Sequence, residues 1–326
     1  MSDSFWRGRR TFITGATGLM GSWLLQHLVD KGADVIALVR GNARRSIAVD
    51  SGLLNRVTTV HGGVEDFNLV RRSLSEYSID KVFHVAAQAI VGVAKLDPVP
   101  TLETNIRGTW NVLEAARLCG VSRVVMSSSD KAYGASPDLP YKETHPLQGR
   151  NPYDVSKSCA DLIGTMYATT YRLPVCVVRC ANLFGGGDLN FSRTIPGVIR
   201  ATLKGERFVI RSDGKFVRDF LYVKDAADAY LRVAEGLSEE PSLVGEAFNF
   251  GLGVKLTVLE LTDLVLKTLG RTDLEPIVQN QASFEIREQY SCSEKARKML
   301  GWTPRYTFAA GLEETIDWYR NHLTNA

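Results

Sequence analysis

The fold is decided by Thr11-Phe12-Ile13-Thr14-Gly15-Ala16-Thr17-Gly18-Leu19-Met20-Gly21, a stretch close to the N-terminus. Its apolar start predicts a β-strand, and the pattern from Leu19 to Leu28 predicts the helix that follows. The glycines lie between the two, where a dinucleotide-binding fold needs a tight turn and a close approach of backbone to pyrophosphate. We therefore expect a phosphate-binding turn formed by Gly15, Thr17, Gly18, Leu19, Met20 and Gly21.

Short apolar strands and amphipathic helices alternate over the first half of the chain. After the first strand, the predicted strands are Val35–Val39, Val57–Val60, Val82–Ala86, Val124–Ser127 and Val175–Val178, and one predicted helix is Thr101–Leu118. Such alternation is typical of a parallel sheet that helices cover on both faces. We expect an α/β protein with a Rossmann-like, doubly wound parallel sheet.

The sequence changes in character after about residue 183, where Gly185-Gly186-Gly187 precedes a basic helical segment from Arg193 to Lys204. A later helix, Val258–Leu269, starts with a capping box of Thr257 and Glu260, and a final helix ends near Trp318. These elements predict a smaller α/β substrate-binding lobe. We expect residues 1–182 plus about 219–250 to form the dinucleotide-binding domain, and about 183–218 plus 251–326 to form the lobe.

Composition and charge exclude several other classes of protein. The chain has 326 residues and a formal charge of +3, which gives no electrostatic reason to expect a nucleic-acid partner, and Arg71-Arg72 is interpreted as solvated surface. Its five cysteines include no C-x-x-C pair, so we expect neither disulfides nor a metal site, and a cytoplasmic location. The longest apolar stretch, Val82 to Ala94, is too short to span a membrane.

Two segments carry the residues expected to do chemistry. Tyr153 and Lys157 are four residues apart in a predicted helix capped by Asn151, so they share one helical face. An ammonium there lowers the pKa of the phenol, and the tyrosine can take a proton from a sugar hydroxyl while hydride leaves for a nicotinamide. Ser129-Asp130-Lys131 follows the strand Val124–Ser127, at the carboxyl end where open α/β sheets bind ligands.

Together, the G-x-x-G-x-x-G spacing, the Tyr153 and Lys157 pair and Ser129-Asp130-Lys131 resemble the extended short-chain dehydrogenase/reductase family acting on nucleotide sugars. The resemblance covers the whole chain and is strongest to the 4,6-dehydratases of CDP-glucose. Related dTDP-glucose and GDP-mannose dehydratases generally carry glutamate in place of Lys131, and C4-epimerases typically lack the acid–base pair. A nucleotide-sugar epimerase, a dehydratase of dTDP-glucose or GDP-mannose, and a cofactor-sensing binding protein stay as alternatives.

This resemblance implies a three-step cycle that regenerates the cofactor. Tyr153, helped by Ser129 and Lys157, deprotonates the C4 hydroxyl. Lys131 then removes the C5 proton, Asp130 protonates the leaving C6 hydroxyl, and hydride returns to C6 to give a 4-keto-6-deoxy sugar. Lys131 must be neutral to act as a base, whereas Asp130 beside a cation would tend to stay ionised, and the two could also share one proton.

Further cofactor contacts are implied by the same resemblance. Ala86, Ala87 and Gln88 end the fourth strand, and Asn105 lies in the next helix, where structural packing is an equal alternative for the buried amide. Arg40 ends the second strand, where an NAD enzyme usually has an acidic residue.

We expect NAD, and NADP stays open because Arg40, with Arg44 or Arg45, could hold a 2′-phosphate. Stacking on adenine or exposure to solvent is an equal alternative for Arg40. Because Gly63 replaces the family's acidic residue after the third strand, the adenine would rely on backbone groups of Val64.

The expected partner is a small-molecule nucleotide sugar. Beside Gln88 and Ser129, the family resemblance assigns six residues to it, with arginine forks suited to the diphosphate: Asn182, Asn190, Arg193, Arg218, Asp219 and Arg287. Glu285 is a weaker candidate, and a surface salt bridge is an equal reading for Glu285 and Arg287. The resemblance also suggests a homodimer through the helices around Thr101–Leu118 and Tyr153–Tyr171.

Overall fold

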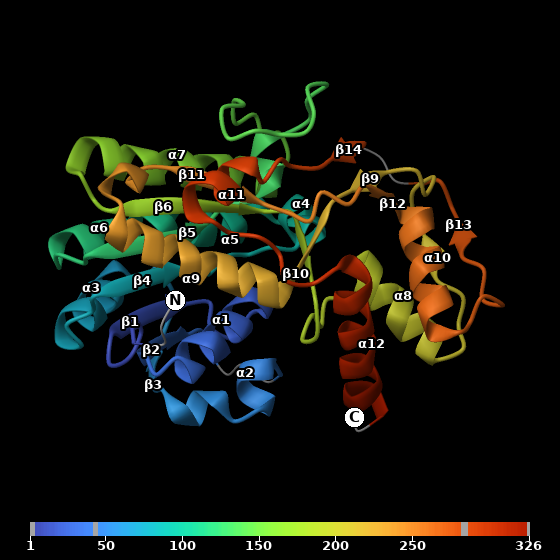
Figure 1. Cartoon of the computed structure of the whole chain (residues 1–326), viewed down its shortest axis with the longest axis horizontal. Coiled ribbons are helices and arrows are strands. Elements are labelled where there is room, and N and C mark those ends of the chain that lie inside the picture. Colours follow the sequence, from blue (N-terminus) through green and yellow to red (C-terminus); the bar gives the residue numbers. More distant parts are fainter. Residues whose placement is uncertain (1–3, 42–44, 282–285, 325–326) are drawn as a thin grey trace.

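A computed structural model describes residues 4–41, 45–281 and 286–324. At its centre lies a seven-stranded sheet in the order β11-β6-β5-β4-β1-β2-β3, in which every neighbouring pair is parallel (Figure 1). Its strands are β1 (Arg10–Thr14), β2 (Asp34–Val39), β3 (Thr58–His61), β4 (Lys81–His84), β5 (Arg123–Ser127), β6 (Val175–Cys180) and β11 (Ala247–Phe250). The predicted Rossmann-like α/β fold is confirmed.

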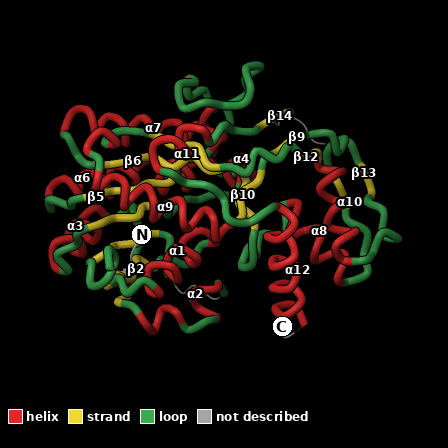
Figure 2. Tube along the Cα trace, viewed as in Figure 1, coloured by secondary structure: helices red, strands yellow, loops and turns green. Residues whose placement is uncertain are grey.

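Helices cover both faces of this sheet, which is why its strands read as nearly continuous apolar runs (Figure 2). Successive strand residues join different cores: Ile13 packs in one buried cluster and Phe12 in the other. The first cluster includes side chains of α1 (Leu19–Asp30), α2 (Ile47–Asp50) and α9 (Val223–Glu239). The second includes side chains of α3 (Phe67–Glu76), α6 (Gly108–Leu118) and α7 (Pro152–Tyr171).

Strand order determines where a ligand can enter. The chain builds β1, β2 and β3 outward in one direction and then returns to place β4 on the other side of β1. In an open α/β sheet, ligands bind beyond the carboxyl ends of the strands at such a reversal. Connecting segments here are η1 (Leu53–Arg56), α4 (Val91–Leu96), α5 (Pro98–Leu102), the π-helical turn η2 (Glu103–Arg107) and η3 (Asp130–Tyr133).

A second group of elements packs around a separate apolar core that includes Val198, Val265 and Ile316, to the right in Figure 1. Its helices are α8 (Thr194–Leu203), α10 (Val258–Leu269) and α12 (Phe308–Thr324). Its short strands form three small sheets: β7 (Asn182–Phe184) with β10 (Phe220–Tyr222), β9 (Val217–Arg218) between β12 (Leu256–Thr257) and β14 (Glu288–Gln289), and β8 (Val209–Ile210) with β13 (Ile277–Val278). Between these segments, α9, η4 (Pro241–Leu243) and β11 return to the large sheet, and α11 (Glu294–Leu300) packs on β11.

Three sequence predictions about helices have different outcomes. The capping box is confirmed, because Thr257 Oγ1 accepts from the Glu260 amide and Glu260 accepts in return. The final helix runs beyond Trp318, to Thr324. The helix predicted over Thr101–Leu118 is confirmed, and it contains the π-helical turn η2 between α5 and α6.

Candidate active site

The glycine turn after β1 is shaped by contacts that no side chain could tolerate. Gly15 has a φ of +75°, and a Cβ there would lie 2.7 Å from the backbone nitrogen of Ala86. A Cβ on Gly21 would lie 2.0 Å from the carbonyl oxygen of Gly15. Gly18 is exposed directly before α1. This turn leaves the first backbone N–H groups of α1 open, so Gly15 to Gly21 fit the pyrophosphate of a dinucleotide.

The predicted contacts at the adenosine end are spread over several elements. Arg40 is exposed directly after β2, and Arg45 donates to His322 Nε2 of α12 at 3.5 Å, while Arg44 lies outside the described residues. Val64 is buried, and its carbonyl oxygen accepts from the Asn111 side chain at 3.0 Å. Of the Val64 backbone groups, the carbonyl is therefore already hydrogen-bonded within the protein.

Hydrogen bonds of Gln88 and Asn105 connect the loop after β4 to α7. Asn105 is buried and bonds both the amide and the carbonyl of Gln88, at 2.8 and 3.0 Å. It also donates to Ser156 Oγ at 2.9 Å. The Gln88 side chain bonds Ile90 of its own loop and Thr101 of α5. These contacts favour the packing alternative for Asn105, which lies in the π-helical turn η2.

Ser129, Asp130, Lys131 and Tyr153 come together at the carboxyl end of β5. Ser129 caps η3 by accepting from the Lys131 amide at 3.2 Å, and its hydroxyl donates to Asp130 Oδ1 at 3.1 Å. The Tyr153 hydroxyl is hydrogen-bonded to the Ser129 side chain. Two segments separated in sequence, η3 and the start of α7, therefore contribute to one polar site.

Tyr153 and Lys157 are both buried, which determines the pKa of each. Burial raises the pKa of Tyr153 to about 12, against the lowering effects of Arg193 and Ser129. Burial also lowers the pKa of Lys157 to about 8, and its Nζ donates to the carbonyl oxygen of Ser127 at 3.0 Å. The expected lowering of the phenol pKa is wrong for this structure, because desolvation of the ring outweighs the nearby positive charge.

Burial also raises the pKa of Asp130. The carboxyl is completely buried, and burial raises its pKa to about 6, although Lys131 and the Ser129 hydroxyl act in the opposite direction. Its Oδ2 has no hydrogen-bond partner. Desolvation is the larger effect and raises the pKa, but a carboxyl with a pKa of about 6 is still mostly ionised at pH 7, as the sequence predicted. A carboxyl with this pKa can donate a proton near neutral pH.

The residues predicted to hold the nucleotide lie in the second group of elements. Arg193, at the start of α8, donates to Asp188 Oδ2 at 2.9 Å and acts electrostatically on Tyr153. Asn190 accepts from the amide and hydroxyl of Ser192, which stabilises the turn before α8. Asn182 donates to the Asp219 carbonyl oxygen at 3.0 Å. Among the predicted nucleotide contacts, Arg193 is the one whose charge lowers the pKa of Tyr153.

Arg218 and Arg287 both lie near Phe216, which no sequence motif indicated. Their guanidinium groups approach the Phe216 ring at 5.6 and 5.9 Å. Arg287 also donates to Asp213 at 3.3 Å, which matches the salt-bridge alternative, and Glu285 lies outside the described residues. The two arginines form a positive group beside the loop before β14.

Asp219 is buried rather than turned toward solvent. Its Oδ1 accepts from the amides of Phe220 and Val254 at 2.8 and 3.1 Å, and its Oδ2 has no hydrogen-bond partner. Burial raises its pKa to about 7, and the neighbouring Asp130 adds to the rise. These contacts favour a structural role over a direct contact with the nucleotide.

We expect Asp219→Asn to weaken the pH dependence of stability. The folded protein binds a proton that the unfolded chain, with an ordinary aspartate pKa of 3.8, has lost, so this stabilisation is complete below about pH 4 and is lost as pH rises through about 7. Urea unfolding at about pH 5 and about pH 8.5 should show a smaller fall in the variant, by up to about 3 kcal/mol. The exposed Asp317→Asn is the control, and an unchanged slope for Asp219→Asn contradicts the assignment.

A buried network of hydrogen bonds and an ion pair lies behind η3, and the sequence motifs did not predict it. Arg179 of β6 forms a bidentate ion pair with Asp161 of α7, at 2.7 and 2.8 Å, and donates to the Tyr133 hydroxyl at 2.7 Å. Asp161 is one helical turn beyond Lys157, so the spacing carried a signal for it, whereas Arg179 is far away in the sequence. The network fixes η3 against the helix that carries Tyr153.

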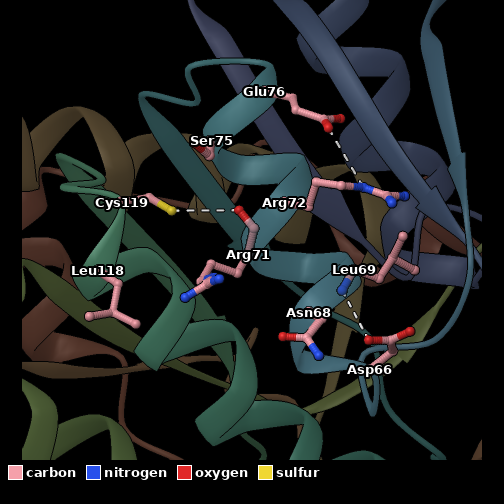
Figure 3. Close-up of a pocket in the computed structure, with 9 residues that line it drawn as sticks. All are labelled: Asp66, Asn68, Leu69, Arg71, Arg72, Ser75, Glu76, Leu118 and Cys119. Atoms are coloured by element: carbon pink, nitrogen blue, oxygen red, sulfur yellow. Dashed lines mark hydrogen bonds and ion pairs between the residues drawn. The ribbon is translucent and has the colours of Figure 1, made fainter.

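A surface hollow of about 870 Å³ lies between α3 and the end of α6, and its residues are not among those of the candidate active site (Figure 3). Arg72 pairs with Glu76 at 3.8 Å, and Arg71 lies over the Phe67 ring at 5.9 Å. The Cys119 thiol donates to the Arg71 carbonyl oxygen. These contacts agree with the interpretation of Arg71-Arg72 as solvated surface.

The described part of the chain contains neither a cluster of metal ligands nor a membrane-spanning helix. In residues 4–41, 45–281 and 286–324, no group of three or more histidine, cysteine, aspartate or glutamate side chains is placed to hold a metal ion. Over the same residues, no helix has the length and apolar character needed to cross a membrane.

Comparison with known proteins assigns the family. Residues 11–251 match the NAD dependent epimerase/dehydratase family, and the chain belongs to it. It is 32% identical to CDP-glucose 4,6-dehydratase of Salmonella typhimurium, over 98% of this chain and 93% of the relative. It is 30% identical to UDP-glucose 4-epimerase of Mycolicibacterium smegmatis, over 96% of this chain and 99% of the relative.

Among solved structures, the dTDP-glucose 4,6-dehydratase of Streptomyces venezuelae with NAD bound superposes with a TM-score of 0.89. It is 29% identical, and the match covers 97% of this chain and 98% of that one. The predicted family is therefore confirmed. The relatives include both dehydratases and epimerases, so the family alone does not choose between the two reactions.

Proposed function

We propose that the protein is a nucleotide-sugar 4,6-dehydratase that converts CDP-glucose to CDP-4-keto-6-deoxyglucose and water. The observation that carries the proposal is the buried Asp130, with a pKa of about 6, adjoining Lys131 and hydrogen-bonded to the serine that contacts Tyr153. An epimerase that only oxidises and reduces C4 has no need of an acid and a base for water loss. The similarity to CDP-glucose 4,6-dehydratase supports the choice of sugar nucleotide.

The proposed cofactor is NAD, held by the glycine turn Gly15 to Gly21 and by the backbone around Val64, Ala86 and Ala87. When bound, it supplies the acceptor for the C4 hydride, the donor that returns hydride to C6, and a positive charge that favours the phenolate of Tyr153. The NAD-bound structural neighbour supports this choice. Arg40 is exposed at the end of β2, so binding of NADP is to be measured in parallel.

The first proton transfer is assigned to Tyr153. Its phenolate oxygen takes the proton of the C4 hydroxyl as hydride leaves C4, and the hydrogen bond to Ser129 orients it. Lys157 is held by its hydrogen bond to the Ser127 carbonyl oxygen, one helical turn after Tyr153. The oxidised C4 makes the C5 proton acidic, which prepares the second step.

In the second step, Lys131 takes the C5 proton as a neutral amine, and Asp130 gives its proton to the C6 hydroxyl. The C5–H and C6–O bonds break, a C5–C6 double bond forms, and water leaves. Hydride then returns to C6 and a proton to C5, which gives the 4-keto-6-deoxy sugar. The raised pKa of Asp130 supports its role as the acid, because an ionised carboxylate has no proton to give.

The diphosphate is assigned to the proposed lobe of residues 183–218 and 251–326. Arg193, Arg218 and Arg287 supply three guanidinium groups there, Asn190 lies three residues before Arg193, and Asn182 lies directly before the lobe. Guanidinium forks match phosphate oxygens in charge and geometry. This assignment places the sugar end of the substrate toward Tyr153, on which Arg193 already acts.

The proposal is tested by mass spectrometry of the protein incubated separately with CDP-glucose, dTDP-glucose, UDP-glucose and GDP-mannose, each with NAD or NADP. Loss of one water from CDP-glucose alone supports it fully. Water loss from another sugar keeps the reaction and corrects the nucleotide. An unchanged mass with a changed C4 configuration, detected by NMR, means that the chain is an epimerase.

We also propose a homodimer formed through α6 and α7. Both helices present apolar side chains to solvent in the single chain, among them Trp110, Leu118, Met166 and Leu162, the last 59% exposed. Apolar surface of this kind, gathered on two neighbouring helices, is typical of an interface.

Leu162→Glu combined with Met166→Glu is expected to give a monomer, because burying two carboxylates against an apolar partner costs several kcal/mol. Sedimentation velocity of the variant and the parent protein checks this. Leu264→Glu on α10, where the side chain is 37% exposed, is the control and should not change the mass. A monomeric parent protein contradicts the proposal.

A further inference from the structure

Gln289 reaches the catalytic loop from a distant part of the chain. Its Oε1 accepts a hydrogen bond from Lys131 Nζ at 3.1 Å. The Gln289 side chain is completely buried, and its Nε2 has no hydrogen-bond partner. No sequence motif pointed to this residue, yet it directly contacts the lysine that the proposed reaction uses as a base.

The backbone around Gln289 is held firmly on two sides. Its carbonyl oxygen accepts from the Asp219 amide at 3.1 Å, and the next carbonyl, of Tyr290, accepts from Tyr141 at 3.0 Å. Strand β14 pairs in parallel with β9 through Gln289 and Arg218. The backbone that carries the Gln289 side chain is therefore held in place, and Lys131 Nζ contacts this side chain at a defined position.

Lys131 also faces carboxyl groups from two elements. Asp130 of η3 and Asp154 of α7 both interact with it electrostatically, and Asp130 in turn faces Arg218 and Asp219. These carboxyls already favour the ammonium form of the lysine. A third carboxylate on Lys131, in direct hydrogen-bond contact with Nζ, would favour that form further.

We infer that Gln289 is a positioning residue that keeps Lys131 able to give up its proton. An amide oxygen accepts a hydrogen bond from an amine as well as from an ammonium, so it fixes the position of Nζ without adding a negative charge. This inference rests on the proposed function, in which Lys131 must be neutral to remove the C5 proton. It assigns to β14 a part in the elimination step and none in the oxidation of C4.

Gln289→Glu tests the inference because it keeps the shape and adds the charge. An opposite charge at this distance raises a lysine pKa by about one to three pH units, so water loss at neutral pH should fall about tenfold or more. Reduction of the cofactor in a single turnover should stay within about twofold of the parent protein, because C4 oxidation does not use Lys131. Raising the pH by the same one to three units should restore the rate of water loss.

Two further variants separate this effect from a structural one. Gln289→Met fills the same space without an acceptor, and it should slow water loss with no shift of the pH profile. Glu288→Gln is the control, since the neighbouring side chain is exposed and the substitution also changes one charge on β14. It should leave both rates and the pH profile unchanged.

The outcomes also separate this inference from the proposed function. If the parent protein removes water from none of the sugars, the proposed function fails and the inference fails with it. If the parent protein dehydrates its substrate, two results overturn the inference alone. These are an unshifted pH profile in Gln289→Glu, and an equal slowing of cofactor reduction and water loss in that variant.

Discussion

Tyr153→Phe is expected to reduce turnover by about 100-fold or more while the dinucleotide stays bound. The substitution removes only the hydroxyl that takes the C4 proton, and positioned proton transfer contributes about 100- to 10,000-fold to a rate. The ring keeps its buried packing at the start of α7, and the glycine turn that holds the cofactor lies on another element. Product formation followed by mass spectrometry, with cofactor binding followed by fluorescence, checks both parts.

The matched control is Tyr167→Phe, which removes a hydroxyl from the same helix at a position in the apolar core behind the sheet. It should leave turnover unchanged. Undiminished product formation by Tyr153→Phe would exclude this tyrosine as the base of the first step. Loss of cofactor binding in the same variant would place its hydroxyl in the binding site instead.

Lys131→Ala is expected to separate oxidation from elimination. Without the amine, the C4 hydroxyl can still be oxidised by way of Tyr153, but the C5 proton has no base, so water loss should fall by about 100-fold or more. The reduced cofactor should then accumulate on the enzyme in a single turnover, visible by its near-ultraviolet absorbance, while little dehydrated sugar forms. In deuterated water, the recovered substrate should carry no deuterium at C5.

Lys142→Ala, at an exposed lysine that follows the same loop, is the control and should not change either rate. An unaltered rate of water loss in Lys131→Ala would show that Lys131 is not the C5 base. Equal loss of oxidation and elimination would instead assign Lys131 to binding of the substrate.

The fold could be predicted from sequence because its signals are local. A strand, a glycine turn and a helix follow one another within Thr11 to Leu28, and the same alternation continues to Val178. The π-helical turn before Gly108 had no local signal, and its residue Asn105 bonds Gln88 and Ser156, which are distant in sequence.

The sequence predicted which residues belong to the candidate site, but it did not predict their pKa values. Tyr153 and Lys157 share a helical face, as their spacing indicates, but their pKa values depend on burial, which requires the complete packing of η3, α7 and α8. Burial likewise raises the pKa of Asp130 above its ordinary value. Gln289 had no local signal at all, since its role follows from the pairing of β14 with β9.

The position of β11 at the edge of the large sheet has a consequence for synthesis of the chain. Its partner β6 is complete at Cys180, but β11 begins only at Ala247, after α8 and α9. Until the ribosome has added this segment, β6 presents a strand of six residues, five of them apolar, along an open hydrogen-bonding edge. In the folded protein, β11 covers this edge of β6. A chain that stops before Ala247 leaves the edge unpaired, so we expect truncated products to aggregate.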